Sequence, residues 1–226
     1  VTDGINYKFF GSAQDHKRVG EGDTGKNTGG MGCYSPSRLL SKDLDLKIKS
    51  KIIEPTLNAI NESGGVYKGF LYVGLMIKDN QPFLIEFNVR MGDPECQTIL
   101  PTLNTDLFDV LISCCDGTLN QININFSKLK SICVVLCSNG YPEKFENNIA
   151  IKNLEQLKLL ENQNIFHAGT LKKKTGIVSN GGRVLNFVST SEDFVKCKDE
   201  AINLIKKLNW KNGFFRRDIG NKVIQT

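Results

Sequence analysis

The amino-acid sequence predicts an α+β protein in which an antiparallel sheet with helices is followed by a small β-rich domain. The first observation is a hairpin pattern, because residues 70–77 and 83–89 are apolar runs on either side of the turn Asp79-Asn80-Gln81-Pro82. The second is a change in the sequence pattern after about residue 120, where short apolar runs alternate with polar turns. We therefore expect two domains, residues 1–120 and residues 121–226.

The part of the chain before the hairpin predicts a strand, a loop and a helix. Residues 5–10 predict a strand already under way at the start, so we expect that an N-terminal portion of the protein is missing. Residues 11–38 are rich in Gly, Ser, Asn and Asp and are expected to form a long loop. In residues 44–60, apolar side chains recur at three- and four-residue spacing. This spacing predicts a helix that kinks or restarts at Pro55 and ends at Gly64-Gly65.

The part after the hairpin predicts helices first and strands later. Residues 99–103 and 107–115 are expected to be helical, with Asp106 as the N-cap of the second helix and Asp116-Gly117 at its end. A last amphipathic helix is expected to begin near Ser191, with acidic residues in its first turn. The strands of the second domain are expected at residues 131–137, 164–169, 176–179 and 183–188.

Composition narrows the class of protein. The net charge is 29 − 24 = +5 and comes from scattered lysines, with no basic stripe interleaved with aromatic residues, so nucleic-acid binding is the weaker interpretation. No apolar run approaches the ~18 residues of a membrane span, and no signal peptide opens the chain. The seven cysteines form no C-x-x-C pair and most lie among apolar residues, which is typical of reduced thiols in a cytoplasmic protein.

Three polar side chains alternate along the return strand of the hairpin, namely Glu86, Asn88 and Arg90. Successive side chains of a strand point to opposite faces, so these three are expected to share one face. The apolar residues between and before them are expected to fill the opposite, buried face; these are Ile85, Phe87 and Val89. Glu and Asn supply the oxygen ligands that Mg²⁺ or Mn²⁺ uses beside nucleotide phosphates, and Arg can bind phosphate through two hydrogen bonds. A solvated outer face with an incidental ion pair remains the alternative on these residues alone.

Glycine-rich segments suggest further anion sites. Residues 20–27 nearly match the pattern G-x-x-x-x-G-K-[ST], but Asn27 replaces the hydroxyl and no apolar helix follows, so a P-loop is rejected. The glycines of residues 27–32 can offer backbone N–H groups to an anion or a small substrate, or can simply provide flexibility. The segment Gly92-Asp93-Pro94-Glu95 allows a turn and a helix start whose amides could bind an anion, although by itself it fits an ordinary turn better.

The two histidines, His16 and His167, have no spacing that supports a metal site. Each is interpreted as structural or as a hydrogen-bonding member of a site. A Ser-His-Asp hydrolase is not supported, because no nucleophile-elbow motif occurs.

Six short motifs occur in a fixed order along the chain. They are QDHKR at 14–18, NTGGMG at 27–32, EFNVRMGDPE at 86–95, FHAGT at 166–170, NGGRVL at 180–185 and RDIG at 217–220. Together they resemble the phosphoribosylamine–glycine ligases, the glycinamide ribonucleotide synthetases of purine biosynthesis, which are ATP-grasp enzymes. Met91 is one departure, because the family usually has Phe or Leu there, and Met is a mild apolar replacement.

The resemblance implies a fold, a reaction and a set of site residues. The first domain would be the C-terminal half of an ATP-grasp domain, in an enzyme that joins glycine to 5-phosphoribosylamine with ATP and Mg²⁺ (or Mn²⁺) through a glycyl phosphate. Glu86 and Asn88 would be metal ligands, and Arg90 would be catalytic by steadying the transferring phosphoryl group. The substrate-binding residues would be Asp15, Lys17, Arg18, Asn27, Thr28, Gly29, Gly30, Met31, Gly32, Asp93, Pro94 and Glu95.

The resemblance also implies partners for the chain. In the family an N-terminal α/β domain and a nucleotide clamp come first, and neither has a counterpart in this sequence. We therefore expect the missing N-terminal domains of the same polypeptide as partners, and negligible turnover by the isolated chain. Two rival interpretations are another ATP-grasp carboxylate–amine ligase and a non-catalytic nucleotide-binding module.

Overall fold

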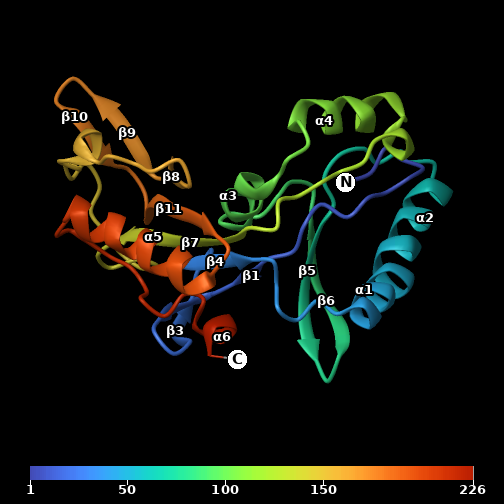
Figure 1. Cartoon of the computed structure of the whole chain (residues 1–226), viewed down its shortest axis with the longest axis horizontal. Coiled ribbons are helices and arrows are strands. Elements are labelled where there is room, and N and C mark those ends of the chain that lie inside the picture. The colour runs from blue at the N-terminus through green and yellow to red at the C-terminus, as the bar shows by residue number, and fades with distance from the viewer. Residues whose placement is uncertain (226) are drawn as a thin grey trace. The chain divides into compact units, whose positions relative to one another are not determined.

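The structure is a computed structural model that describes residues 1–225 (Figure 1). The chain divides into two compact units, and neither is a continuous stretch of sequence. The first unit comprises residues 1–12, 37–92 and 103–127, and the second comprises residues 13–36, 93–102 and 128 onward. Segments 13–36 and 93–102 thus pack with the C-terminal half of the chain. The predicted domain boundary near residue 120 stays a prediction.

A long helical segment opens the main part of the first unit. Helix α1 (Lys42–Ile48) is capped by Ser41, whose side chain accepts a hydrogen bond from Leu44 N, and it runs through a π-helical turn (Lys49–Ile53) into α2 (Glu54–Glu62). Pro55 lies in the first turn of α2, directly after the π-helical turn. The predicted restart at this proline is confirmed.

The hairpin of the first unit is formed by β5 (Tyr72–Lys78) and β6 (Gln81–Asn88). The turn consists of Asp79 and Asn80, whose φ angles of 50° and 54° suit the two-residue turns that match strand twist. Gln81 and Pro82 already belong to β6, so the turn is two residues shorter than expected. A register shift between Gly74 and Leu75 interrupts the pairing.

The start of the chain differs from the expected strand. Residues 5–10 contain no strand, and only isolated bridges pair Thr2 with Tyr7 and with Gly69. The Asp3 side chain accepts hydrogen bonds from Ile5 N (2.9 Å) and Asn6 N (2.7 Å), which bends the chain into a turn. The prediction was wrong because this local turn was not recognised.

The first unit is completed by α4 (Leu107–Asp116) and a 3₁₀ turn (Leu119–Gln121). Asp106 caps α4 by accepting a hydrogen bond from Phe108 N at 2.8 Å. Gly117 ends the helix in the left-handed conformation, with φ of 74°. Both predicted ends of this helix are confirmed.

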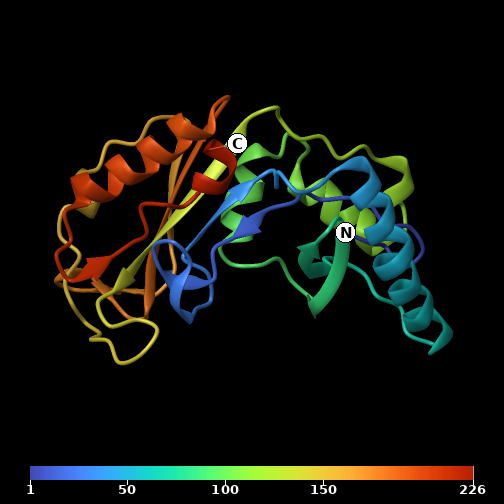
Figure 2. The ribbon, with the colours of Figure 1, turned by 90° about the horizontal axis from the view of Figure 1, so that it is seen from below.

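The second unit is built on a six-stranded antiparallel sheet (Figure 2). The strands in spatial order are β1 (Gln14–Asp15), β4 (Gly32–Ser35), β7 (Lys130–Ser138), β11 (Arg183–Ser191) and β8 (Gln163–His167), with β12 (Gly213–Phe214) also paired to β7. Helix α5 (Phe194–Leu208) packs against β7 and β11, and its side chains share a core with theirs. The capping side chain of α5 is Asp193, two residues after the expected start.

Residues 11–38, expected to be a loop, contain four short strands. Besides β1 and β4 they form the hairpin of β2 (Arg18–Gly20) and β3 (Thr24–Asn27). Strand β4 is buried throughout and pairs with β7 along its whole length. Its composition of Gly, Cys, Tyr and Ser gave no strand signal, because pairing with a distant buried strand decides its conformation.

The remaining elements of the second unit are short. They are α3 (Glu95–Ile99) with a 3₁₀ turn (Leu100–Thr102), a 3₁₀ turn (Leu154–Gln156), the hairpin of β9 (Thr170–Lys173) and β10 (Gly176–Ser179), and α6 (Asn221–Ile224). Helix α3 therefore begins four residues before the expected helix at 99–103. The four strands expected after residue 130 are all confirmed as β7, β8, β10 and β11.

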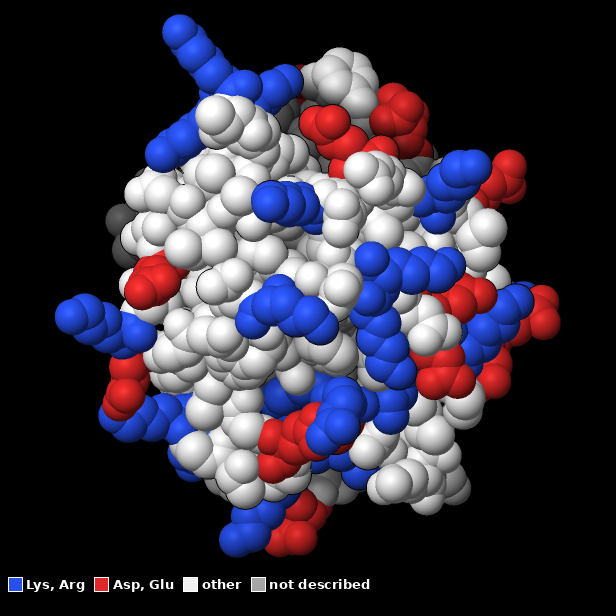
Figure 3. Space-filling model, turned by 90° about the vertical axis from the view of Figure 1, so that its left-hand side faces the viewer, with Lys and Arg blue, Asp and Glu red and all other residues white. Residues whose placement is uncertain are grey.

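The surface and the thiols agree with the composition. On the face in Figure 3, lysine and arginine side chains are interspersed with uncharged surface and with acidic side chains. All seven cysteines carry free thiols, and five of them are buried. Within residues 1–225, none of the helices is both long enough and apolar enough to cross a bilayer.

Candidate active site

Glu86 and Asn88 lie on one face of β6 in the first unit. The Asn88 side-chain amide Nδ2 donates a hydrogen bond to Glu86 Oε1 at 3.1 Å. Gly74 lies opposite Glu86 on β5, and a Cβ there would come within 3.0 Å of Glu86 Cγ. The shared face of Glu86 and Asn88 is therefore confirmed, and the glycine opposite leaves room for the glutamate stem.

The face expected to be buried is not buried. Ile85 is 63% exposed and Val89 is 77% exposed, while Phe87 is partly buried. Strands β5 and β6 form a sheet of only two strands, and the register shift near Gly74 leaves Ile85 without a paired residue. Apolar character in the sequence was taken to imply burial, and for Ile85 and Val89 this was wrong.

Arg90 lies beyond the end of β6, in a bend. Its guanidinium Nη1 donates a hydrogen bond to the carbonyl of Met91 at 2.9 Å. The alternation of strand side chains stops at Asn88, so it does not fix the direction of Arg90. That Arg90 shares the face of Glu86 stays a prediction.

The Glu86–Asn88 pair fits a hard divalent cation. Glu86 is exposed, and rotating the Asn88 amide exchanges Nδ2 for Oδ1, so that two oxygen-bearing side chains face the same point. In the described part of the chain, no group of three or more His, Cys, Asp and Glu side chains is arranged to hold a metal ion. Mg²⁺ takes six oxygen ligands, so this pair supplies only part of the set.

A buried carboxylate is the centre of the candidate substrate residues in the second unit. Asp15 ends β1, and its side chain is only 8% exposed, with Lys17 Nζ 2.6 Å from its Oδ2. Burial and the neighbouring negative charge of Glu95 raise the pKa of Asp15 to about 6, against the opposing effect of Lys17. The structure thus brings Asp15, Lys17 and Glu95 together.

The glycines of residues 27–32 serve close packing, and their amides are engaged. Gly29 N donates to the Tyr141 hydroxyl at 3.0 Å, Gly30 N to Thr28 Oγ1 at 3.0 Å, and Met31 N to the His16 carbonyl at 2.9 Å. The expectation of amides on offer to an anion is therefore not met at these residues. The groups that accept hydrogen bonds from the Gly29 and Gly30 amides are both hydroxyls.

Gly30 shows why glycine is needed in this loop. Its φ is +123°, and a Cβ would lie 2.7 Å from Pro94 Cδ and 2.8 Å from Asp15 Oδ1. A side chain at this position would therefore push apart the loop, the Asp93-Pro94 turn and the buried carboxylate. The packing places Pro94 beside Asp15 through Gly30, and the shared role of these residues in substrate binding stays a prediction.

The anion site expected at the start of α3 stays a prediction. Helix α3 has only five residues, and Asp93 Oδ1 beside its start accepts a hydrogen bond from Gln97 Nε2 at 3.1 Å. A carboxylate at this position favours cations, so it weakens the case for an anion.

Arg183 is a residue of this site that the sequence did not single out. Its guanidinium donates to the carbonyls of Gly29 (3.0 Å) and Asp93 (2.6 Å), and it forms an ion pair with Asp93 Oδ2 at 3.3 Å. The arginine belongs to one of the motifs, but no local pattern indicates which distant carbonyls it meets. A single Arg at the start of a buried strand carries no such signal.

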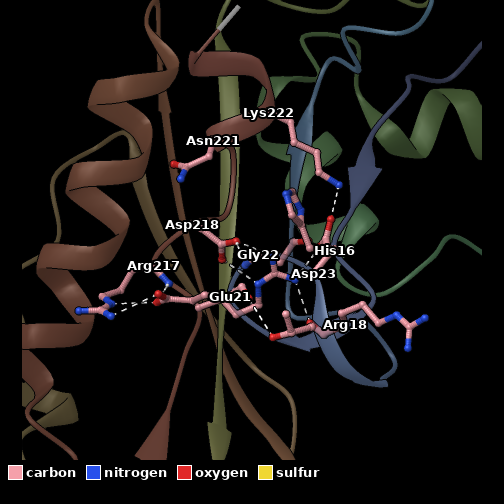
Figure 4. A network of polar contacts seen from close by, with 12 residues as sticks. His16, Arg18, Glu21, Gly22, Asp23, Arg217, Asp218, Asn221 and Lys222 are labelled. Carbon is pink, nitrogen blue, oxygen red and sulfur yellow. Dashed lines mark hydrogen bonds and ion pairs between the residues drawn. The ribbon is translucent and has the colours of Figure 1, made fainter.

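Arg18 and Asn27 lie on the β2–β3 hairpin, which a buried arginine holds. Figure 4 shows Arg18, Gly22 and Asp23 of this hairpin beside Asp218. Arg216 binds Asp218 through two hydrogen bonds of 2.8 and 2.6 Å, and its Nη1 donates to Asp23 Oδ1 (3.0 Å) and to the Arg18 carbonyl (2.9 Å). The Arg18 guanidinium is exposed and donates to Gly25 O at 2.7 Å. Residues 20–27 thus form a strand hairpin, which agrees with the rejection of a P-loop.

His16 is buried beside these residues as a neutral imidazole. Its Nδ1 lies 3.2 Å from the Gly32 carbonyl, and its Nε2 has no hydrogen-bond partner. Burial and the positive charge of Arg216 lower the pKa of His16 to about 4. This agrees with the interpretation of His16 as a structural residue. His167 is exposed and lies 2.8 Å from Thr170 Oγ1 through its Nδ1.

Comparison with solved structures first defines the class of protein. The structure of biotin carboxylase from Campylobacter jejuni covers 87% of this chain with a TM-score of 0.57 at 14% identity, which is a likeness of fold alone. The crystal structure of phosphoribosylamine–glycine ligase from Thermotoga maritima covers 92% of the chain with a TM-score of 0.80 at 35% identity. The fold is that of the ATP-grasp proteins, as predicted.

Family models and relatives then define the family. Residues 1–96 match the ATP-grasp (A) domain of phosphoribosylglycinamide synthetase, and residues 131–222 match its C domain. The chain is 44% identical to phosphoribosylamine–glycine ligase (chloroplastic) of Arabidopsis thaliana and 40% identical to that of Haemophilus influenzae. Each match covers 100% of this chain, but only 43% and 52% of those proteins. The chain therefore belongs to the phosphoribosylglycinamide synthetase family, and it spans about half the length of the curated relatives it matches.

Proposed function

We propose that this chain is the C-terminal part of a phosphoribosylamine–glycine ligase. Such an enzyme uses ATP to join glycine to 5-phosphoribosylamine and gives glycinamide ribonucleotide, ADP and phosphate in purine biosynthesis. The observation that carries the proposal is the Glu86–Asn88 pair on one face of β6, in a chain whose residues 1–96 and 131–222 match two models of this family.

Three residues of the first unit would serve the nucleotide phosphates. Glu86 and Asn88 would hold Mg²⁺ or Mn²⁺ through side-chain oxygens, and Arg90 would steady the phosphoryl group that is transferred. The cation, when bound with ATP, supplies neutralisation of the charge on the transferred phosphoryl group. Positioning and charge neutralisation are the main requirements of phosphoryl transfer, and these three side chains supply both.

The proposed reaction has two steps. A carboxylate oxygen of glycine attacks the γ-phosphorus of ATP, and the bond to the bridging oxygen breaks to release ADP and leave glycyl phosphate. The amine nitrogen of 5-phosphoribosylamine then attacks the glycyl carbonyl carbon, forms the amide bond and expels phosphate, with loss of a proton from nitrogen.

The polar residues of the second unit would bind glycine and the ribose phosphate. The close packing of Asp15, Lys17, Gly30 and Glu95 provides buried and exposed charges of both signs within one small region. That arrangement suits substrates that carry an ammonium group, a carboxylate and a phosphate. The remaining residues of this set are Arg18, Asn27, Thr28, Gly29, Met31, Gly32, Asp93 and Pro94.

Activity would require the portion of the relatives that this chain does not match. We propose that the N-terminal domains of the same polypeptide supply the rest of the ATP site, so that the 226-residue chain alone turns over negligibly. The free thiols support a cytoplasmic protein, where disulfides are not maintained.

The proposal is tested by ligase assays on the full-length protein that carries this chain. We expect ADP release that needs ATP, Mg²⁺, glycine and 5-phosphoribosylamine together, with Glu86→Gln lowering kcat/KM by about 100-fold or more. Glu62→Gln, a change at an exposed glutamate of α2, is the matched control and should leave kcat/KM unchanged.

Other outcomes would identify a different function. Turnover with a different carboxylate or amine, and none with glycine and 5-phosphoribosylamine, would indicate another ATP-grasp carboxylate–amine ligase. Binding of Mg-ATP that does not depend on Glu86, with no turnover, would indicate a nucleotide-binding module.

A further inference from the structure

We infer, on the basis of the proposed function, that Arg183 is a positioning residue of the substrate site. It fixes the loop of residues 27–32 and the Asp93-Pro94 turn against each other by donating hydrogen bonds to their backbone carbonyls. This role deepens the proposed function, because the two segments carry most of the residues proposed to bind glycine and ribose phosphate.

The hydrogen bonds of Arg183 are directed mainly at main-chain atoms. Nη1 lies 3.0 Å from the Gly29 carbonyl, 3.5 Å from the Gly30 carbonyl and 2.6 Å from the Asp93 carbonyl. Nη2 lies 3.3 Å from Asp93 Oδ2. The two N–H groups of Nη1 are therefore shared among peptide carbonyls of two distant segments, and the 3.5 Å contact with Gly30 is the longest of the three.

The sheet holds the stem of Arg183 in place. Arg183 is the first residue of β11 and pairs with Cys137 of β7, both of which lie in the buried part of the second unit. The side chain is only 20% exposed. Strand pairing holds the backbone at Arg183, although the register shifts between Arg183 and Leu185, and the guanidinium is held by its own hydrogen bonds to the two segments.

The loop is shaped to receive this arginine. A Cβ on Gly29 would lie 3.0 to 3.2 Å from the guanidinium atoms of Arg183, so glycine is the residue that allows this approach. From the other side, the Tyr141 hydroxyl accepts the hydrogen bond of Gly29 N. The peptide groups on both sides of Gly29 are thus held by the C-terminal half of the chain.

The effect of Arg183 reaches Asp15 through Gly30. Gly30 packs against the Asp15 carboxylate and Pro94, so a shift of the loop would move the wall of the buried carboxylate. The guanidinium Nη1 and Nη2 of Arg183 donate to protein oxygens. Arg183 therefore acts on the substrate-binding residues indirectly, by holding the loop that carries them. Errors of about 1 Å in such a wall can lower the rate about 100-fold.

The experiment compares Arg183→Lys and Arg183→Met in the full-length protein, with Arg217→Lys as the matched control. Arg217 is an exposed arginine of the same unit, and its guanidinium binds the side chain of Glu21. We expect faster hydrogen exchange in peptides that cover residues 27–32 and 93–95 for both Arg183 variants, and no change for the control.

The kinetic readout separates positioning from a purely structural role. We expect the KM for glycine to rise, the KM for ATP to stay within about threefold, and kcat/KM for glycine to fall by about 100-fold in Arg183→Met. Lysine can restore only part of the fork, so Arg183→Lys should lie between Arg183→Met and the unchanged protein.

Three results would overturn the inference. They are unchanged exchange in the loop of an Arg183 variant, faster exchange with no change in the KM for glycine, and a glycine KM altered equally by Arg217→Lys. If Arg183→Met fails to fold, Arg183→Lys gives the same tests. If the full-length protein without any substitution had no ligase activity, the proposed function would be overturned, and the role of Arg183 in the substrate site would be overturned with it.

Discussion

The loop of residues 27–32 and the β2–β3 hairpin are consecutive in the sequence, yet two arginines hold them by different chemistry. Arg183 binds the loop mainly through backbone carbonyls, and it is 20% exposed. Arg216 binds the hairpin through the carboxylate of Asp23 as well as the Arg18 carbonyl, it is paired with Asp218 outside the hairpin, and it is 2% exposed. A region held by its main chain keeps its side chains available for ligands, whereas a region held by ion pairs commits those side chains to the fold.

The comparison predicts different consequences of losing each arginine. Removing Arg183 leaves the Gly29 and Asp93 carbonyls, which water can satisfy. Removing Arg216 empties a fully buried position and takes an ion-pair partner from Asp218 and Asp23, whose side chains are 18% and 35% exposed. The first change should act chiefly on the geometry of the site, and the second chiefly on stability.

The largest effect is expected for Arg216→Met. The free energy of unfolding should fall by about 3–5 kcal/mol, since one member of a buried ion-pair group is removed. Arg183→Met should cost about 1–3 kcal/mol. Urea unfolding measures both, and Arg217→Met at the exposed pair with Glu21 should leave the midpoint unchanged. Equal losses for Arg216→Met and Arg183→Met would remove the distinction between the two regions.

A smaller effect is expected for Gly30→Ala. Its φ of +123° and the contact with Pro94 both oppose a side chain, so the free energy of unfolding should fall by about 2–4 kcal/mol. Gly22, in the turn of the β2–β3 hairpin, has φ of +68° and no atom within 4 Å of a built Cβ. Gly22→Ala should therefore cost only about 1 kcal/mol. Thermal or urea unfolding of the Gly30→Ala and Gly22→Ala variants measures both losses of stability. A larger loss for Gly22→Ala would contradict the packing described for Gly30.

The smallest effect is a difference in pH dependence between neighbouring residues. The pKa of Asp15 is raised from 3.8 to about 6, so its contribution to stability is present at low pH and is lost as the pH rises through that range. The pKa of His16 is lowered from 6.5 to about 4, so its contribution is present above pH 6.5 and is lost as the pH falls toward 4. Between about pH 4 and pH 6 the two contributions oppose each other.

Substitutions at these two residues should separate the contributions. Relative to the unchanged protein, His16→Asn should gain about 1–3 kcal/mol of stability on going from pH 6 to pH 4, and Asp15→Asn should lose a similar amount. Asn at 16 can still donate to the Gly32 carbonyl, as His16 Nδ1 does. Urea unfolding at several pH values measures the difference. Variants that follow the unchanged protein at every pH would show that neither group titrates as described.

The first unit was predicted well where local signals are strong. Asp106, Pro55 and the Asp79-Asn80 turn act through local geometry, and each was recognised in the sequence. Strand β4 was missed, because its conformation depends on pairing with β7 about 100 residues later.

In the candidate site, too, local features were predicted and features that depend on distant contacts were not. Alternation along a strand predicted the shared face of Glu86 and Asn88 correctly, since it is a local property of the backbone. It predicted burial of Ile85 wrongly, because burial depends on what covers the strand. The contacts of Arg183 could not be predicted, since they are made mainly with backbone carbonyl groups, and every residue has one.

The buried Arg216 has a consequence for the order in which the protein acquires its shape. Arg216 is 198 residues from Arg18, whose carbonyl it binds, and Asp218 accepts the Gly22 amide from the same hairpin. During synthesis on the ribosome, the hairpin that carries Arg18 and Asn27 cannot be locked until residues 216–218 have emerged. Contacts between such distant positions form late, because the intervening chain must first be ordered. If synthesis stalls before residues 216–218 have emerged, the β2–β3 hairpin lacks its contacts with Arg216 and Asp218 and is accessible to proteases and chaperones.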